Sequence, residues 1–315
     1  MTCIVALLPI SIGALVTTLK AGMAFADWPT SDGQNMLLYP WLNDLRRTDK
    51  FVEHGHRLAG VLIGLVSIAL VVVAFIKEKA LWVRVGAVVI LLAVIGQGLL
   101  GGLRVIKNAQ VLAMTHSITA GLFFTLCFLF AILVRRQSSE SNTAKDRRIS
   151  AATFAAGLLL PVAVLGQYFL GGMFRHLGRM LHEHVAGAII VTLLATVVLV
   201  TLCRSDLPSI RRRGRWLAAA LLIQLGLGMG AWLTKLGFAS LGWVATANSP
   251  AQNVVCSLHT VGGMFLLATA SAGAMELILR FRTGQLSELS ATFHAGSAVK
   301  TLAADDSQRT KGGLA

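Results

Sequence analysis

The chain has 315 residues, of which 55% are hydrophobic and only 13% are charged. Roughly a quarter of the residues in soluble domains are charged, so this composition excludes an ordinary soluble protein and predicts an integral membrane protein. The formal net charge of +14 does not indicate nucleic acid as a partner, because Lys and Arg gather in short loops, where the positive-inside rule places them. Membrane lipid is the expected environment.

Apolar stretches of about 20 residues, the length of a membrane-spanning helix, recur along the whole chain. The first begins almost at Met1, but it lacks the basic start of a signal peptide and continues towards Lys20, which favours a span; a segment before it stays open. Eight spans are predicted, over residues 3–24, 56–76, 81–103, 111–134, 150–174, 181–203, 215–236 and 254–279.

Basic residues are concentrated in the loops after the second, fourth and sixth stretches. The other loops between spans are poorer in Lys and Arg, or balance them with Asp. The positive-inside rule therefore predicts that both termini lie in the cytoplasm, N-in/C-in. The short loops suit a bacterial inner (cytoplasmic) membrane.

The two halves of the chain resemble each other. Histidine motifs open the even stretches, as in "EHGHRLAG", "AMTHSITAG", "LHEHVAG" and "SLHTVGG", and glycine-rich motifs mark the odd ones, as in "GQGLLGG", "GQYFLGG" and "IQLGLGMG". This pattern predicts a duplicated four-helix unit, and an even number of spans per unit makes the repeat parallel. The glycines allow close helix packing, and they also suit a flat slot for a planar ligand; both interpretations stay open.

The predicted fold class is therefore all-α integral membrane, with eight transmembrane helices arranged as two parallel-repeat four-helix bundles. We expect an N-terminal bundle over 1–135, a cytoplasmic linker over 136–149, a C-terminal bundle over 150–280 and a disordered cytoplasmic tail over 281–315.

Four histidines, one in the first turns of each even stretch, are predicted to lie at one depth on the outer side. They are His56, His116, His184 and His259. Ionisable groups inside a membrane are costly and are functional candidates by default. Two imidazoles that face each other from different helices of a bundle suit haem iron. Zinc and copper suit less well, because neither half offers thiolates or carboxylates at metal-ligand spacing.

Two of these histidines belong to doublets, His54/His56 and His182/His184. Residues two apart point to different faces of a helix, so one member of each doublet is expected to bind iron. His56 is preferred in the first half because Arg57 and an Ala-Gly pair follow it. His184 is preferred in the second half, with His182 as an open alternative and His54 as the corresponding one in the first.

Glu53 is three residues before His56, which places both side chains on one helical face. A carboxylate there can lie beside an iron ligand or a substrate; the alternative is an ion pair with Arg57, four residues later. In the second half Glu183 is adjacent to His184 and points elsewhere. The first half therefore favours a reaction site, and the second a resident electron-transfer cofactor.

These motifs give the chain a family likeness. Over roughly 5–280 it resembles the haem A synthases, eight-helix proteins of respiratory membranes, through "GALVTTLKAGMAFADWP", "EHGHRLAG", "GQGLLGGLRV" with "LAMTH", "GQYFLGGMF", and "HEHVAG" with "SLHTVGG". The resemblance implies oxidation of the C8 methyl of haem O to a formyl group through two hydroxylations and loss of water. The product, haem A, serves terminal oxidases.

The resemblance also implies residue roles. His56 and His116 would hold the substrate haem O, His184 and His259 would be the axial ligands of a haem b cofactor, and Glu53 would act near the reacting methyl. Haem O synthase and terminal-oxidase assembly factors are implied as partners, and a homo-oligomer stays open. The long farnesyl tail of haem O calls for a slot that opens to lipid.

Some features depart from the family pattern or leave alternatives. Some bacterial members carry a cysteine pair in the first outer loop, where this chain has Phe25 and Ser31. A thiol-linked step in that form is therefore excluded here. A di-haem b electron carrier without catalysis is the main alternative function, and a transporter built from parallel repeats is a weaker one. Candidate propionate contacts are Arg57, Arg104, Arg175 and Arg179.

Overall fold

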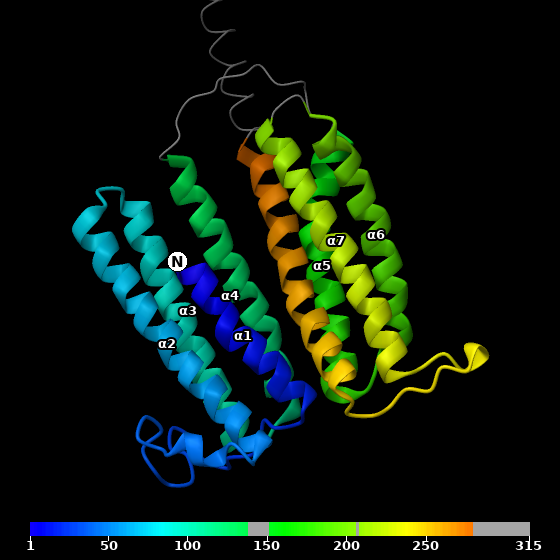
Figure 1. The fold of residues 1–315 in the computed structure, drawn as a ribbon. Helices are drawn as coiled ribbons and strands as arrows, with labels where there is room; N and C mark the ends of the chain where they lie inside the picture. Colours follow the sequence, from blue (N-terminus) through cyan, green and yellow to red (C-terminus); the bar gives the residue numbers. More distant parts are fainter. Residues whose placement is uncertain (138–150, 206–207, 280–315) are drawn as a thin grey trace, which may run out of the picture.

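The computed structural model describes residues 1–137, 151–205 and 208–279, and over these ranges it is helical, without β-strands. The helices are α1 (Thr2–Thr18), α2 (Thr48–Lys77), α3 (Leu81–Ile106), α4 (Gln110–Gln137), α5 (Ala151–Leu177), α6 (Leu181–Cys203), α7 (Pro208–Lys235) and a final helix Pro250–Leu279, orange in Figure 1. Two short 3-10 turns, η1 (Trp41–Asp44) and η2 (Ala239–Leu241), lie in the loops. The predicted tail, 281–315, and residues 138–149 of the predicted linker lie outside the described residues.

Seven helices, from α2 to Pro250–Leu279, are long and apolar enough to cross a membrane. The prediction of an all-helical, multi-pass membrane protein is therefore confirmed. The first predicted span, 3–24, corresponds to α1, whose 17 residues rise by only about 25 Å. It ends earlier than expected because Lys20 adopts a left-handed backbone, with φ 54°. The eighth span, the orientation and the repeat stay predictions.

The helices gather in two groups that stand side by side (Figure 1). In the first group α2 packs against α1 and α3, and α4 packs against α1 and α3. In the second, α6 packs against α5 and α7, and Pro250–Leu279 stands between α7 and the first group (Figure 1). Each group thus encloses an interior to which helices from its own half contribute.

At the interface between the groups α4 packs against α5 and also contacts the final helix. The rings of Phe124 and Phe265 meet edge to face, with centroids 5.0 Å apart. Nearer the end of α4, Arg136 donates to Glu276 over 3.1 Å. These contacts hold the final helix against the first group, so residues from the second half can help to line a cavity in the first.

Helix α2 begins at Thr48, eight residues before the predicted span. The polar motif around Glu53 and His56 is therefore part of the helix and does not form a loop in front of it. Glu53 and His56 share one helical face and line the same cavity, as their spacing predicts.

Candidate functional site

A cavity of about 310 Å³ lies within the first group of helices. Its walls come from α1, α2, α3 and α4, and from Trp28 and Met36 in the loop between α1 and α2. Tyr168 and Arg175 on α5, with Thr260 and Met264 on the final helix, complete the lining. The cavity therefore belongs to the first half of the chain but depends on the second half for part of its wall.

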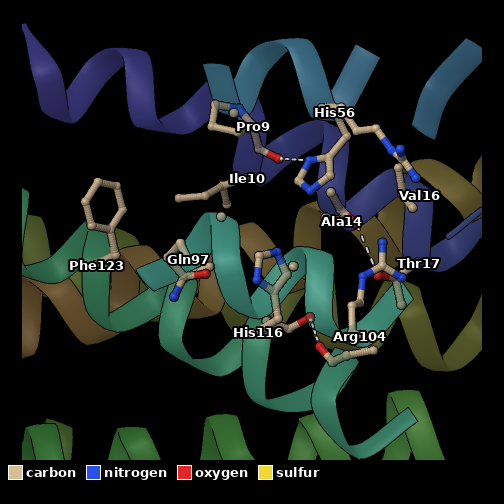
Figure 2. A pocket seen from close by; sticks show the side chains of 18 of the residues that line it. Pro9, Ile10, Ala14, Val16, Thr17, His56, Gln97, Arg104, His116 and Phe123 are labelled. Atoms are coloured by element: carbon tan, nitrogen blue, oxygen red, sulfur yellow. Dashed lines mark hydrogen bonds between the residues drawn. The ribbon is translucent and has the colours of Figure 1, made fainter. Parts of the chain in front are cut away.

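His56 and His116 face each other across this cavity from α2 and α4 (Figure 2). Their ring centroids are 6.2 Å apart and their planes are inclined by 82°. His184 on α6 and His259 on the final helix form a second pair with the same separation and inclination. The structure thus brings all four predicted histidines together in the predicted pairs.

The two doublets are separated by helical geometry, as expected for residues two apart. His54 is buried but points into the loop between α1 and α2, where its Nδ1 lies 3.3 Å from the hydroxyl of Ser31. His182 is exposed at the start of α6. His56 and His184 are therefore the members that face a partner histidine.

Each of the four paired histidines packs against a glycine on an odd-numbered helix. A Cβ atom built on the glycine would lie 2.8 to 3.1 Å from Cε1 of the ring, closer than ordinary van der Waals contact. The pairs are Gly13 with His56, Gly101 with His116, Gly171 with His184 and Gly228 with His259. Glycine is required here because the helix backbone itself supports the imidazole.

The residue four positions before each of these glycines faces the Nδ1 side of the same histidine. His56 Nδ1 lies 2.9 Å from the carbonyl oxygen of Pro9 (Figure 2), and the amide of Gln167 lies 3.0 Å from His184 Nδ1. A contact at Nδ1 orients a ring so that Nε2 is left to bind a metal.

The other two histidines follow the same arrangement less completely. Nδ1 of His116 and Nδ1 of His259 lie against the backbone of Gln97 and Gln224, without a hydrogen bond of normal geometry in the described part of the chain. The sequence-based prediction did not include these glutamines. The signal that could have found them is the spacing of Gln and Gly by four residues in "GQGLLG", "GQYFLG" and "IQLGLG".

The paired histidines fit a haem. Two imidazole nitrogens that bind the same metal ion from opposite sides, each at about 2 Å, are about 4 Å apart. The ring centroids lie farther from the metal than the nitrogens do, which agrees with the observed centroid separation of 6.2 Å in both pairs. Within the described ranges no group of three or more His, Cys, Asp or Glu side chains is placed to hold a metal ion. A two-ligand set of this kind leaves the remaining coordination positions to a porphyrin.

Glu53 lies in the cavity wall and is only 1% exposed. Its Oε1 accepts a hydrogen bond from Arg57 at 3.0 Å, and its Oε2 accepts from the backbone N–H groups of Ala24 at 2.7 Å and Phe25 at 3.2 Å. The ion pair with Arg57 is therefore present, and it does not remove Glu53 from the cavity. Three donors fix the carboxylate one helical turn from His56.

Three of the four arginines predicted to contact propionates line the cavity. Arg57 also donates to loop carbonyls, and Arg104 donates to the carbonyl of Gly22 at 2.9 Å. The guanidinium of Arg175 has its hydrogen-bond acceptors within the protein. It donates to two carbonyls and two threonine hydroxyls on α1 and the final helix. Arg179 is exposed and does not line the cavity.

The loop between α1 and α2 is held against the site by buried side chains. Phe25 and Ser31, at the positions of the cysteine pair in some family members, are both fully buried. The Phe25 ring contacts Tyr39 edge to face at 5.2 Å and lies 5.8 Å from the ring of His54. Phe25 and Ser31 thus meet at His54, which anchors the loop that delivers two N–H groups to Glu53.

Comparison with known proteins gives a consistent result. The family described as COX15-CtaA, cytochrome oxidase assembly protein, matches residues 1–183. A protein of Symbiobacterium thermophilum named heme A synthase is 32% identical over 183 residues, 55% of this chain and 56% of that relative. A heme A synthase of an Exiguobacterium species is 24% identical over 260 residues, covering 74% of this chain and 81% of the relative. No solved structure matches.

Proposed function

Because the chain belongs to the COX15-CtaA family of cytochrome oxidase assembly proteins, the haem A synthase family, we propose that it oxidises the C8 methyl group of haem O to a formyl group. Two relatives named heme A synthase support this substrate. The match with the first covers little more than half of that relative. The observation that carries the proposal is the cavity itself, because a facing histidine pair and a buried carboxylate share its walls.

The two histidine pairs take different roles in this proposal. His56 and His116, in an N-terminal bundle over 1–135, hold the substrate haem, and the cavity between them supports this assignment. His184 and His259, in a C-terminal bundle over 150–280, bind haem b. Haem b, when bound, would supply one-electron transfer. A bacterial inner membrane and cytoplasmic termini belong to the same proposal.

The residues around the cavity position the substrate and handle a proton. Arg57 and Arg104 bind propionates through charge-assisted hydrogen bonds, because both reach the cavity near the outer loop. Glu53 accepts a proton at its carboxylate beside the reacting methyl. Its three donors hold the oxygen atoms in place, so that the carboxylate does not need to reorganise during the reaction.

The proposal is tested by purifying the full chain from cells that make haem O, then extracting and identifying its haems. Haem B together with haem O or haem A is the expected result. Haem B alone would instead indicate the electron carrier without catalysis, and absence of any haem would exclude both functions. Pyridine haemochrome spectra distinguish these outcomes.

Glu53→Gln tests the proton-accepting role. It keeps the shape of the side chain but removes the carboxylate, so we expect both haems to bind while haem A formation falls about 100-fold or more. The matched control is Glu183→Gln, since Glu183 is exposed and outside the cavity. Undiminished haem A formation by Glu53→Gln would show that Glu53 is not the acceptor.

A further inference from the structure

Two glycines form a thin part of the cavity wall, Gly60 on α2 and Gly98 on α3. Both line the cavity, and both are exposed. A Cβ atom built on either one would meet no atom within 4 Å. Since α2 and α3 are neighbours, the wall between them carries no side chain at either of these two positions, which leaves space for an opening at this level.

This opening lies deeper in the bundle than the histidine pair. Gly60 is four residues after His56, about 6 Å further along α2. Gly98 is three residues before Gly101, the glycine that supports His116. The basic residues Arg57 and Arg104 lie towards the outer loop, where both hydrogen-bond. The opening is therefore at the opposite edge of the ring site from the groups that suit propionates.

The surface around the opening is apolar. Leu62 and Leu65 on α2, and Ile95 and Leu99 on α3, are exposed large hydrophobic residues. Both helices belong to the membrane-spanning set, so these side chains face hydrocarbon. A ligand group that passes between Gly60 and Gly98 would therefore move from an apolar cavity directly into lipid, without crossing a polar layer.

The second histidine pair lacks a matching pair of glycines. The residue four positions after His184 is Ala188, and the residue three positions before Gly228 is Leu225. Both carry side chains where the first half has none. The opening is thus a property of the half that holds the cavity, and it suits a ligand that must enter and leave.

We propose that the gap framed by Gly60 and Gly98 binds the long isoprenoid tail of the substrate haem and guides it into the lipid. This inference rests on the proposed function, since it assumes that the ring lies between His56 and His116. The ring is then oriented by its two ends: the propionates turn to the arginines and the apolar tail turns to the hydrocarbon.

The test compares two haems on the full chain in lipid nanodiscs, with the second site already loaded with haem b. Haem O carries the tail and haem B lacks it, and each is titrated by its Soret absorbance. The first-site signal is the one lost in His116→Ala. Gly60→Leu and Gly98→Leu are expected to weaken haem O binding about tenfold or more, as when side-chain atoms are forced into an occupied space, and to leave haem B within about twofold.

Two other glycines provide matched controls. Gly64 on α2 and Gly96 on α3 also have no atom within 4 Å of a built Cβ, but neither lines the cavity. Gly64→Leu and Gly96→Leu should bind both haems as the wild type does. Equal weakening of haem O and haem B by the Gly60 and Gly98 variants, or no weakening of either, would overturn the tail site. A wild-type first site that binds neither haem would overturn the proposed function itself.

Discussion

Gly171 supports the ring of His184, and Gly171→Ala tests how closely that ring is held. A Cβ atom at position 171 would lie 2.9 Å from Cε1 and 3.4 Å from Nδ1 of the ring. Carbon atoms in good contact are about 3.5 Å apart or more, so the imidazole would have to move by roughly half an ångström. The amide of Gln167, 3.0 Å from Nδ1, restricts that movement.

The size of the effect follows from the tolerance of metal sites. Ligand positions are specified to about 0.2 Å, and loss of the groups that orient a ligand costs about 10- to 100-fold in affinity. We therefore expect Gly171→Ala to weaken haem b binding by this factor, about 1.4–2.7 kcal/mol. Absorbance titration measures the affinity, and a change from a low-spin to a high-spin spectrum reports loss of the second axial ligand.

Gly166→Ala is the control on the same helix. Gly166 is exposed and has no atom within 4 Å of a built Cβ, so alanine should leave haem binding unchanged and favour the helix by up to about 1 kcal/mol. Wild-type affinity and a low-spin spectrum in Gly171→Ala would refute the reasoning, because His184 would then not be a closely supported axial ligand.

Arg175→Met should lower the free energy of unfolding by roughly 3 kcal/mol, because backbone carbonyls on α1 and the final helix lose a charged donor. Thermal unfolding in detergent measures this loss. The control is Arg179→Met, since Arg179 is exposed, and an equal loss in the two variants would contradict the prediction. Partial burial, with the hydrogen bond and charge of Asp44, raises the pKa of Tyr39. Its contribution to stability is therefore complete below the ordinary pKa of about 10 and is lost only as pH rises through the raised value. Since Tyr168 is the only other tyrosine, the difference in phenolate absorbance between wild type and Tyr39→Phe isolates Tyr39, and half-ionisation near pH 10 would contradict the prediction.

Local pattern was sufficient to predict much of the fold. Long apolar stretches identify helices in a membrane because hydrocarbon leaves the backbone no other partner than itself. The same stretches misplace their ends when polar residues continue a helix, as at the start of α2, or when a single residue such as Lys20 turns the chain. Hydropathy expresses the preference of each residue type for water or hydrocarbon. It contains no information about the backbone geometry at a helix terminus.

By itself the sequence determined that His56, His116, His184 and His259 occupy equivalent positions near the starts of four helices. Their register is a matter of spacing along a helix, which the chain encodes locally. The choice between members of a doublet is of another kind. It depends on which face of α2 or α6 meets a neighbouring helix. Only the packing shows that His54 points to the loop between α1 and α2 and that His182 is exposed.

The surroundings of the site were likewise decided by tertiary structure. Glu53 obtains two of its three donors from loop residues almost 30 positions earlier, and Arg175 binds α1 from the other half of the chain. Contacts of this kind join segments that are far apart in the sequence, and helical periodicity does not predict them. The sequence therefore predicted which groups would carry the proposed chemistry. The packing of α1 and the final helix against the cavity decided which of them face it and which hold the two halves together.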